Sequence, residues 1–417
     1  MSQLTDAAKL RRTVAKVVQE TPVLDMHTHL YPPAFGPLLL WGVDELLTYH
    51  YLTAEFFRYS DTAPEDFFAL SKKEQAERIW QALFIDHSPL SESNRGVLTV
   101  LSSLGLDVNS RDLGKLRRYF AGRKAADYVD TVFELANVEA VVMTNDPFDD
   151  LERPVWESGA GAGDPRFKAA LRIDPLLNDW DRACHRLAGW GYRTSLELTD
   201  ETLTEIRRFL ADWIGRMKPL YLAVSLPPSF RFPEAGKRAA ILEKCIVPVT
   251  RQAGIPFAMM IGVNKLVNPR LGLAGDGLGK ADMGTVEAIA RSFPDNRFLV
   301  TFLSRENQHE ACVTARKFSN VMLFGCWWFM NNPSIIREIT AERLELLGTS
   351  VVPQHSDARV LDQLIYKWSH SREIIAEVLA EKYQDLLRTG WALCEEEIRR
   401  DVKNLLCDNF KRFVGWK

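Results

Sequence analysis

Short apolar runs rich in β-branched residues recur along the chain, and most are followed by turn residues and a stretch with helical periodicity. They predict eight strands, at Val23–His27, Glu139–Thr144, Lys168–Ile173, Tyr221–Ser225, Pro256–Ile261, Arg297–Phe302, Val321–Gly325 and Ser350–His355. Apolar positions three or four residues apart predict helices in the intervals, for example at Thr202–Met217, Ala235–Ala253, Asp282–Phe293, His309–Phe318 and Pro333–Leu347.

Strands that alternate with helices form parallel βα units, and eight such units predict an α/β fold of the (β/α)8 TIM-barrel type. In a barrel of this type the active site lies at the carboxyl ends of the strands. The alternative is an open, doubly wound sheet, but no G-x-G-x-x-G string follows the first strand to support it.

Two segments exceed the minimal barrel of about 250 residues. Residues 31–138 are rich in Leu, Phe and Tyr at helical spacing and predict a helical insertion between strands one and two, over the barrel mouth. Residues 361–417 predict a C-terminal block of helices packed on the barrel. The expected organisation is therefore an N-terminal helix and first strand in residues 1–30, the insertion in 31–138, the remaining barrel in 139–360 and the C-terminal helices in 361–417.

The composition is that of an ordinary globular enzyme, with 46% hydrophobic and 26% charged residues among 417. The net charge of -3 gives no electrostatic reason to expect a nucleic-acid or membrane partner. No apolar run approaches the roughly 20 residues that span a bilayer, and Met1–Glu20 lacks the apolar core of a signal peptide. Six scattered Cys with no C-x-x-C pair predict reduced thiols and a cytoplasmic location.

His27-Thr28-His29 ends the first predicted strand. Because residues i and i+2 of a strand point to the same face, both imidazoles are expected to point into the barrel at its active end. Two converging imidazoles favour a divalent cation. The alternative is a pair of polar histidines that merely hydrogen-bond at a strand end.

A third ligand is expected from Asp357, just past the eighth strand, because that strand neighbours the first in a closed barrel. The alternative role for Asp357 is the N-cap of the next helix. Two His and one carboxylate leave coordination positions open for water or substrate. Strands four, five and six offer no further Lys, Glu or His ligand, so we expect one divalent ion, zinc first, with manganese, iron or cobalt as alternatives.

Further polar residues are expected at the mouth. His50-Tyr51 in the insertion could relay protons or could simply pack among aromatic neighbours. Arg172 at the end of strand three and Arg359 after strand eight could bind an anion such as a carboxylate, or Arg172 could pair with Asp174. Trp327-Trp328-Phe329 after strand seven could wall the site against water or fill the barrel top.

The order and spacing of these strings resemble one branch of the amidohydrolase superfamily, the uronate (glucuronate) isomerases. The corresponding strings here are His27-Thr28-His29, His50-Tyr51, Thr144-Asn145-Asp146-Pro147, Arg172, Trp327-Trp328-Phe329, Asp357-Ala358-Arg359, Cys407-Asp408-Asn409 and Phe413-Val414-Gly415. Three departures leave the identity of the sugar acid open. Met260-Ile261-Gly262 stands where the family commonly has His-Ile-Gly, Ala358 replaces a Ser, and Ser225-Leu226-Pro227-Pro228 differs from the family's charged rim.

The resemblance implies a metal-dependent aldose–ketose isomerase that converts a hexuronate through an enediol. It implies catalytic roles for Asp357, Tyr51, His50 and Arg359, substrate contacts from Arg172, Arg359, His50 and Trp328, and metal ligation by His27, His29 and Asp357. The implied partner is a small-molecule sugar acid, and a homo-oligomer is compatible with the sequence. Two alternatives stay open: a mononuclear hydrolase or decarboxylase of a lactone or carboxylic acid, and an inactive sugar-acid binding protein.

Overall fold

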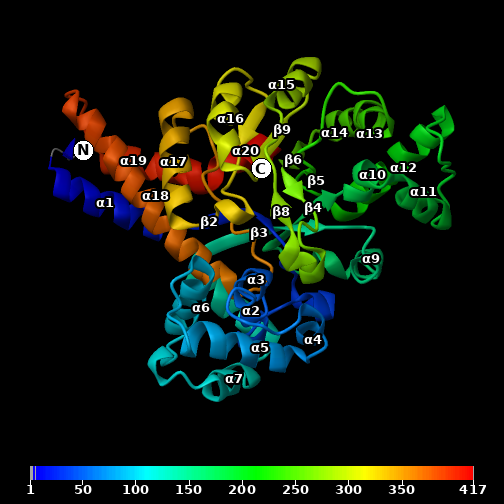
Figure 1. Ribbon diagram of the computed structural model, residues 1–417. Helices are drawn as coiled ribbons and strands as arrows, with labels where there is room; N and C mark the ends of the chain where they lie inside the picture. The colour runs from blue at the N-terminus through cyan, green and yellow to red at the C-terminus, as the bar shows by residue number, and fades with distance from the viewer. Residues whose placement is uncertain (1–2, 5, 417) are drawn as a thin grey trace.

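A curled parallel sheet of seven strands forms the centre of the molecule (Figure 1). The computed structural model describes residues 3–4 and 6–416; residues 1, 2, 5 and 417 of the expected terminal segments lie outside this part. In chain order the strands of the sheet are β2 (Val23–Thr28), β3 (Val138–Asn145), β4 (Phe167–Arg172), β5 (Leu222–Leu226), β6 (Phe257–Ile261), β9 (Phe298–Phe302) and β10 (Val321–Leu323). Each pairs in parallel with the next of these, so seven predicted strands are confirmed to within a few residues.

The eighth predicted strand, Ser350–His355, is wrong as a strand. Only Val352 pairs with the neighbouring segment, in a single parallel bridge to Phe324. Pro353 follows at once and has no N–H to donate to a ladder, so the pairing cannot continue. The segment nevertheless occupies the eighth position of the barrel.

The barrel closes through four short backbone hydrogen bonds of this segment. On one side the Val352 N–H donates to the carbonyl of Leu323 (3.1 Å), and the Gly325 N–H donates to the carbonyl of Val352 (2.9 Å). On the other side Asp357 N–H donates to the carbonyl of His27 (3.2 Å), and His29 N–H donates to the carbonyl of Ala358 (2.8 Å). The ring is therefore continuous, as in a TIM barrel, although the eighth position carries no regular strand.

Helices with one apolar face surround the sheet. The predicted helices are found as α12 (Asp200–Met217), α15 (Met283–Ser292), α16 (Gln308–Ala315) and α17 (Pro333–Leu347). The expected helix Ala235–Ala253 starts two residues later and is interrupted by a π-helical turn, giving α13 (Lys237–Ile241), η5 (Leu242–Ile246) and α14 (Val247–Ala253). Shorter helices follow β3 and β4: α9 (Glu152–Glu157), η4 (Ala160–Ala162), α10 (Asp174–Asn178) and α11 (Trp180–Gly189).

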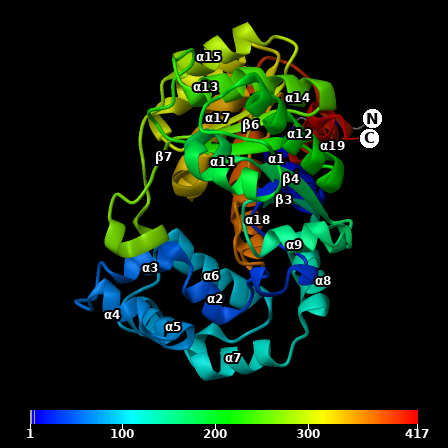
Figure 2. The ribbon, with the colours of Figure 1, turned by 90° about the vertical axis from the view of Figure 1, so that its right-hand side faces the viewer.

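The interval between β2 and β3 is helical and gathers on one side of the sheet (Figures 1 and 2). Its apolar faces, including Phe67, Ile79 and Leu101, are buried in the main core. The elements are η1 (Pro33–Leu38), α2 (Val43–Leu47), α3 (His50–Phe56), α4 (Pro64–Phe68), α5 (Lys72–Trp80), η2 (Gln81–Ile85), α6 (Glu92–Ser103), η3 (Val108–Ser110), α7 (Leu113–Ala121) and α8 (Ala125–Ala136).

The C-terminal segment is also helical, with α18 (Gln363–Arg388), α19 (Glu395–Lys403), η9 (Asn404–Asp408) and α20 (Asn409–Val414). The long helix α18 packs against α1 (Ala7–Glu20), α6, α8 and α17. Phe410 and Val414 of α20 join the inner barrel cluster that contains Leu24 and Ala140, so α20 covers the amino-terminal end of the barrel. A two-residue antiparallel pairing joins β1 (Gln3–Leu4) to β11 (Leu393–Cys394), which lies between α18 and α19.

A long strap leaves the barrel after β6 and reaches the helical insertion (Figure 2). It consists of the hairpin β7 (Val263–Asn264) and β8 (Gly277–Leu278) with η6 (Pro269–Gly275) at its tip. The tip contacts α3 and α4, and Arg270 forms a two-pronged ion pair with Glu65 (2.9 and 2.8 Å). No helix among the described residues is long and apolar enough to cross a membrane.

Candidate metal centre and active site

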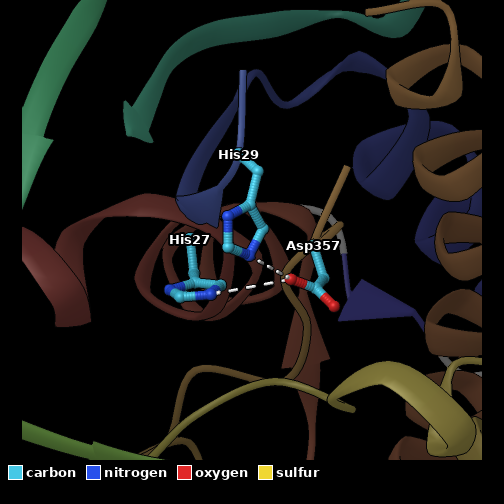
Figure 3. Close-up of side chains that lie close together, drawn as sticks. All are labelled: His27, His29 and Asp357. Atoms are coloured by element: carbon cyan, nitrogen blue, oxygen red, sulfur yellow. Dashed lines mark ion pairs between the residues drawn. The ribbon is translucent and has the colours of Figure 1, made fainter. Parts of the chain in front are cut away.

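The structure brings the side chains of His27, His29 and Asp357 together at the mouth of the barrel (Figure 3). Their ligand atoms all lie within 4.8 Å of one another. Asp357 Oδ1 is 3.6 Å from His27 Nε2 and 3.4 Å from His29 Nε2. Two imidazole nitrogens and one carboxylate oxygen are a donor set that divalent transition metals accept, with room for further ligands.

A hydroxyl group behind each imidazole selects the tautomer that a metal requires. The hydroxyl oxygens of Tyr221 and Thr144 lie 3.4 and 2.9 Å from the Nδ1 atoms of His27 and His29. Each hydroxyl donates its own proton to the backbone carbonyl just before its histidine, at 2.6 Å for Tyr221 and 3.0 Å for Thr144. The oxygens therefore accept from Nδ1–H, which leaves both Nε2 lone pairs free toward Asp357.

The electrostatics favour neutral imidazoles. Burial lowers the pKa of His27 to about 3, although the negative charge of Asp357 opposes this shift. Burial, together with the positive charge of Arg359, also holds the pKa of His29 well below its usual value. His27 Nε2 and Asp357 Oδ1 are buried with no hydrogen-bond partner among the described residues. Buried polar atoms without partners are rare in proteins, so a divalent ion fits this group.

Asp357 is held in a strained conformation rather than as a helix cap. Its φ angle is 50°, in the left-handed region that costs a residue with a Cβ atom of order 1 kcal/mol. The next helix, α18, begins at Gln363, and Asp362 occupies its cap position. The N-cap alternative for Asp357 is therefore wrong, because the residue lies six positions before that helix.

His50 and Tyr51 begin α3 and lie beside the aromatic string after β10. The rings of His50 and Trp328 meet edge to face at 5.6 Å, and Tyr51 stacks on Phe329 at 5.9 Å. His50 Nε2 and Tyr51 Oη are buried and have no hydrogen-bond partner among the described residues. Burial lowers the pKa of His50 and raises the pKa of Tyr51, so both are neutral near pH 7. Packing thus fixes their rings while their polar atoms remain available.

The two candidate anion-binding arginines differ. Arg172 pairs with Asp174 through two hydrogen bonds of 2.8 and 2.9 Å, as the ion-pair alternative predicts, and reaches Ser225 Oγ at 3.2 Å. The side chain of Arg359 donates no hydrogen bond to any described residue, and its Nε is buried without a partner. Of the two, Arg359 therefore has the guanidinium that is free to bind an anion.

No protein-family model matches the chain, and no curated protein matches it. The chain is 58% identical to a solved uronate isomerase from Bacillus halodurans C-125. The alignment covers 99% of this chain and 97% of that protein, and the two structures superpose with a TM-score of 0.97. The chain belongs to the uronate isomerase family.

Two more distant members of the family share the fold. The uronate isomerase of Thermotoga maritima is 15% identical with a TM-score of 0.77, and the glucuronate isomerase of Caulobacter crescentus is 14% identical with a TM-score of 0.79. Alignments with them cover 97% and 98% of this chain, and 97% and 94% of theirs. The TM-scores at such low identity show that the barrel and its additions are kept together across the family.

A cavity of about 710 Å³ opens beside the metal group. Its walls come from the barrel mouth, the helical insertion and the strap; they include His29, Tyr31, Leu38, Thr48, His50, Phe68, Lys72, Leu271, Leu273 and Arg359. Trp328 faces a smaller neighbouring cavity of about 290 Å³, which His50 also lines. Trp328 and Met260 are both buried in the inner barrel cluster.

The sequence interpretation assigned no role in the site to four residues of this region, although it named Thr144 within the string that ends the second strand. Thr144 and Tyr221 support the histidines, and Tyr31 and Glu152 form a hydrogen-bonded pair at the cavity wall. Thr144 lies at the end of the strand beside His29, and Tyr31 lies two residues after His29, so neighbouring strand ends could have suggested them. Nothing local in the sequence points to Tyr221 or Glu152 as partners of the site.

Proposed function

We propose that this chain catalyses the aldose–ketose isomerisation of a hexuronate such as glucuronate or galacturonate. The observation that carries this proposal is one cavity lined both by His29 of the metal group and by Arg359, whose guanidinium is unpaired among the described residues. A sugar acid has matching chemistry, with oxygens at its reacting end and a carboxylate at the other. The relative from Bacillus halodurans, which is called a uronate isomerase, supports the same reaction.

We further propose that His27, His29 and Asp357 hold one divalent ion, with zinc preferred over manganese, iron or cobalt. Such an ion would supply positive charge that polarises the substrate carbonyl and stabilises negative charge developing on its oxygen.

The protein side chains account for the proton movements. The carboxylate of Asp357 takes the proton from C2 of the open-chain aldose, which gives the C1–C2 enediol, and returns it to C1, so that the carbonyl group moves from C1 to C2. The O2 hydroxyl must lose a proton and O1 must gain one. Tyr51 Oη and His50 Nε2, buried and unpartnered beside the site, are placed to carry this second proton. Arg359, with help from the remaining N–H groups of Arg172, binds the distant carboxylate.

The surrounding parts have supporting roles in this proposal. Residues 31–138 act as a unit that covers the mouth, and Trp328 limits the site on the side of His50. The partner is a small sugar acid, with no role for nucleic acid or membrane, and the proposal is compatible with a homo-oligomer. A cytoplasmic location is supported by six cysteines that are all buried free thiols.

The test is incubation of metal-loaded protein with glucuronate and galacturonate in deuterated water, followed by NMR. Isomerisation is expected to form the ketose or to exchange deuterium for hydrogen at C2. Hydrolysis of a uronolactone without ketose formation would instead favour the hydrolase alternative. Calorimetric binding of a uronate with neither product nor exchange would favour the inactive binding protein.

A further inference from the structure

Tyr31 and Glu152 form a hydrogen-bonded pair at the edge of the cavity. Tyr31 lies two residues after His29 and lines the cavity together with His29 and Arg359. Its hydroxyl donates to Glu152 Oε1 at 2.6 Å. Glu152 begins α9 and is only 3% exposed, so the carboxylate cannot turn away into solvent.

The second oxygen of Glu152 is also committed. Glu152 Oε2 accepts from the side-chain amide of Asn145 at 3.0 Å and from the backbone N–H of Asp146 at 3.2 Å. All three partners are donors, which is the arrangement that an ionised carboxylate needs. Burial raises the pKa of Glu152 to about 7 against the lowering effect of the bonds from Tyr31 and Asn145, so at pH 8 the group is mainly ionised.

This arrangement fixes the direction of hydrogen bonding at Tyr31. A phenol has one proton, and here that proton is used by Glu152, so only oxygen lone pairs remain for a ligand in the cavity. Tyr31 shares the cavity lining with His29 and Arg359, which puts this residue at the barrel mouth. A hydroxyl group can donate to such an oxygen, whereas a carboxylate cannot.

We propose that Tyr31 is a specificity-determining residue that accepts a hydrogen bond from one hydroxyl of the sugar acid, and that Glu152 is the positioning residue that sets this direction. The proposal rests on the proposed function, since it concerns how the same cavity holds its substrate. Tyr31 then offers acceptors on one wall while Arg359 offers donors on another. The two walls orient the sugar acid, with its carboxylate toward Arg359 and a hydroxyl toward Tyr31.

Glu152→Gln tests the direction because it changes hydrogen bonding with almost no change of shape. The amide oxygen of the variant must face Asn145 and the backbone N–H of Asp146, because both are donors. The amide nitrogen must then face Tyr31 and donate to the phenol oxygen. The O–H of Tyr31 then points into the cavity, so that toward a ligand Tyr31 changes from a hydrogen-bond acceptor into a donor.

Hexuronates in which one hydroxyl at C3, C4 or C5 is replaced by fluorine provide the probe. Fluorine can accept a weak hydrogen bond but cannot donate one. At one of the three positions, wild-type protein at pH 8 is expected to lose about tenfold in kcat/KM relative to the parent sugar, the cost of one unmade hydrogen bond. At the same position that fluorine penalty is expected to disappear in Tyr31→Phe, where neither sugar has a partner, and to fall in Glu152→Gln, where fluorine can accept weakly from the reversed phenol. The inductive effect of fluorine is common to all three proteins, so only differences between them count.

Tyr383→Phe is the matched control, because Tyr383 also donates to a carboxylate, Asp401 (3.0 Å), but lies on α18 away from the cavity. It is expected to keep the wild-type fluorine penalty. If the fluorine penalty in kcat/KM is the same in the wild-type protein and Glu152→Gln at every position, the proposed roles of Tyr31 and Glu152 are wrong. This comparison does not need Tyr31→Phe, so it holds even if that variant fails to fold. A wild-type protein that converts no hexuronate would instead refute the proposed function, and the assignment with it.

Discussion

The hydroxyl of Thr144 is expected to set the metal affinity of the site through His29. It accepts from His29 Nδ1 at 2.9 Å and donates to the carbonyl of Thr28 at 3.0 Å. Thr144→Val removes both bonds with little change of shape. The imidazole of His29 then has no acceptor for Nδ1–H, and the tautomer that presents a lone pair at Nε2 loses its advantage.

The expected loss can be estimated from these bonds. Removing the outer partner of a metal-ligating histidine typically lowers metal affinity about 10- to 100-fold, or about 1.4 to 2.7 kcal/mol. Tyr221→Phe is expected to have a smaller effect, because Tyr221 lies 3.4 Å from His27 Nδ1, at the long limit of a hydrogen bond. The measurement is a competition titration with a chromogenic zinc chelator at pH 7.5.

Thr144→Ser is the control, because serine keeps the hydroxyl and loses only a methyl group. It is expected to bind zinc within about threefold of the wild-type protein, because it keeps the hydrogen bond to His29, which is worth about 1 kcal/mol. If Thr144→Val binds zinc as tightly as Thr144→Ser while His29→Ala abolishes binding, the tautomer argument is wrong and His29 is oriented by packing alone.

Three further predictions concern turnover and stability. Asp357→Asn is expected to abolish isomerisation in the NMR assay while circular dichroism shows an unchanged fold; a fully active variant would remove Asp357 from the mechanism. Arg359→Met is expected to raise KM for a hexuronate at least about tenfold, and Arg359→Lys less, in steady-state kinetics; equal effects would exclude a paired N–H contact. Because burial holds the pKa of Glu152 at about 7 against 4.5 in the unfolded chain, its contribution to stability is greatest below pH 4.5 and is lost as pH rises to 7. Urea titrations across this range should show a fall in the free energy of unfolding that is about 3 kcal/mol larger for the wild-type protein than for Glu152→Gln.

The sequence predicted the regular part of the fold because the barrel strands are buried on both faces. Such strands appear as continuous apolar runs. Because amphipathic helices alternate with them along the chain, few fold classes other than a parallel α/β fold fit the pattern. The ligand pair His27 and His29 could be recognised for a similar reason, since the period of two in a strand is local. The strap of residues 263–278 escaped notice because its two-residue strands have no period to detect.

The pairs that support the site could not be predicted, because they join residues far apart in the chain. Tyr31 and Glu152 are 121 positions apart, and Tyr221 lies 194 positions from His27. Only the closed barrel brings these side chains together. A hydroxyl or carboxylate that orients a ligand has no local pattern, whereas the ligand itself does.

The wrong eighth strand shows how the third ligand is actually held. The segment before Asp357 has only a few backbone hydrogen bonds to its neighbours, so it also depends on side-chain bonds to its backbone. Asp25, two residues before His27 on β2, accepts from the backbone N–H of Ser356 (3.1 Å) and from the indole N–H of Trp368 (2.8 Å). Lys367 donates to the carbonyl of Ser356 at 2.7 Å.

Trp368 and Lys367 both belong to α18, so the C-terminal helices take part in building the metal site. One short strand carries the two histidines and also the carboxylate that fixes the backbone next to Asp357. A slip of that backbone by one residue would move Asp357 Oδ1 by about 3 Å, the rise of one extended residue, and out of reach of both imidazoles. The accuracy of the three-ligand group therefore depends on buried hydrogen bonds between β2, the irregular eighth segment and α18, not on the barrel ladder.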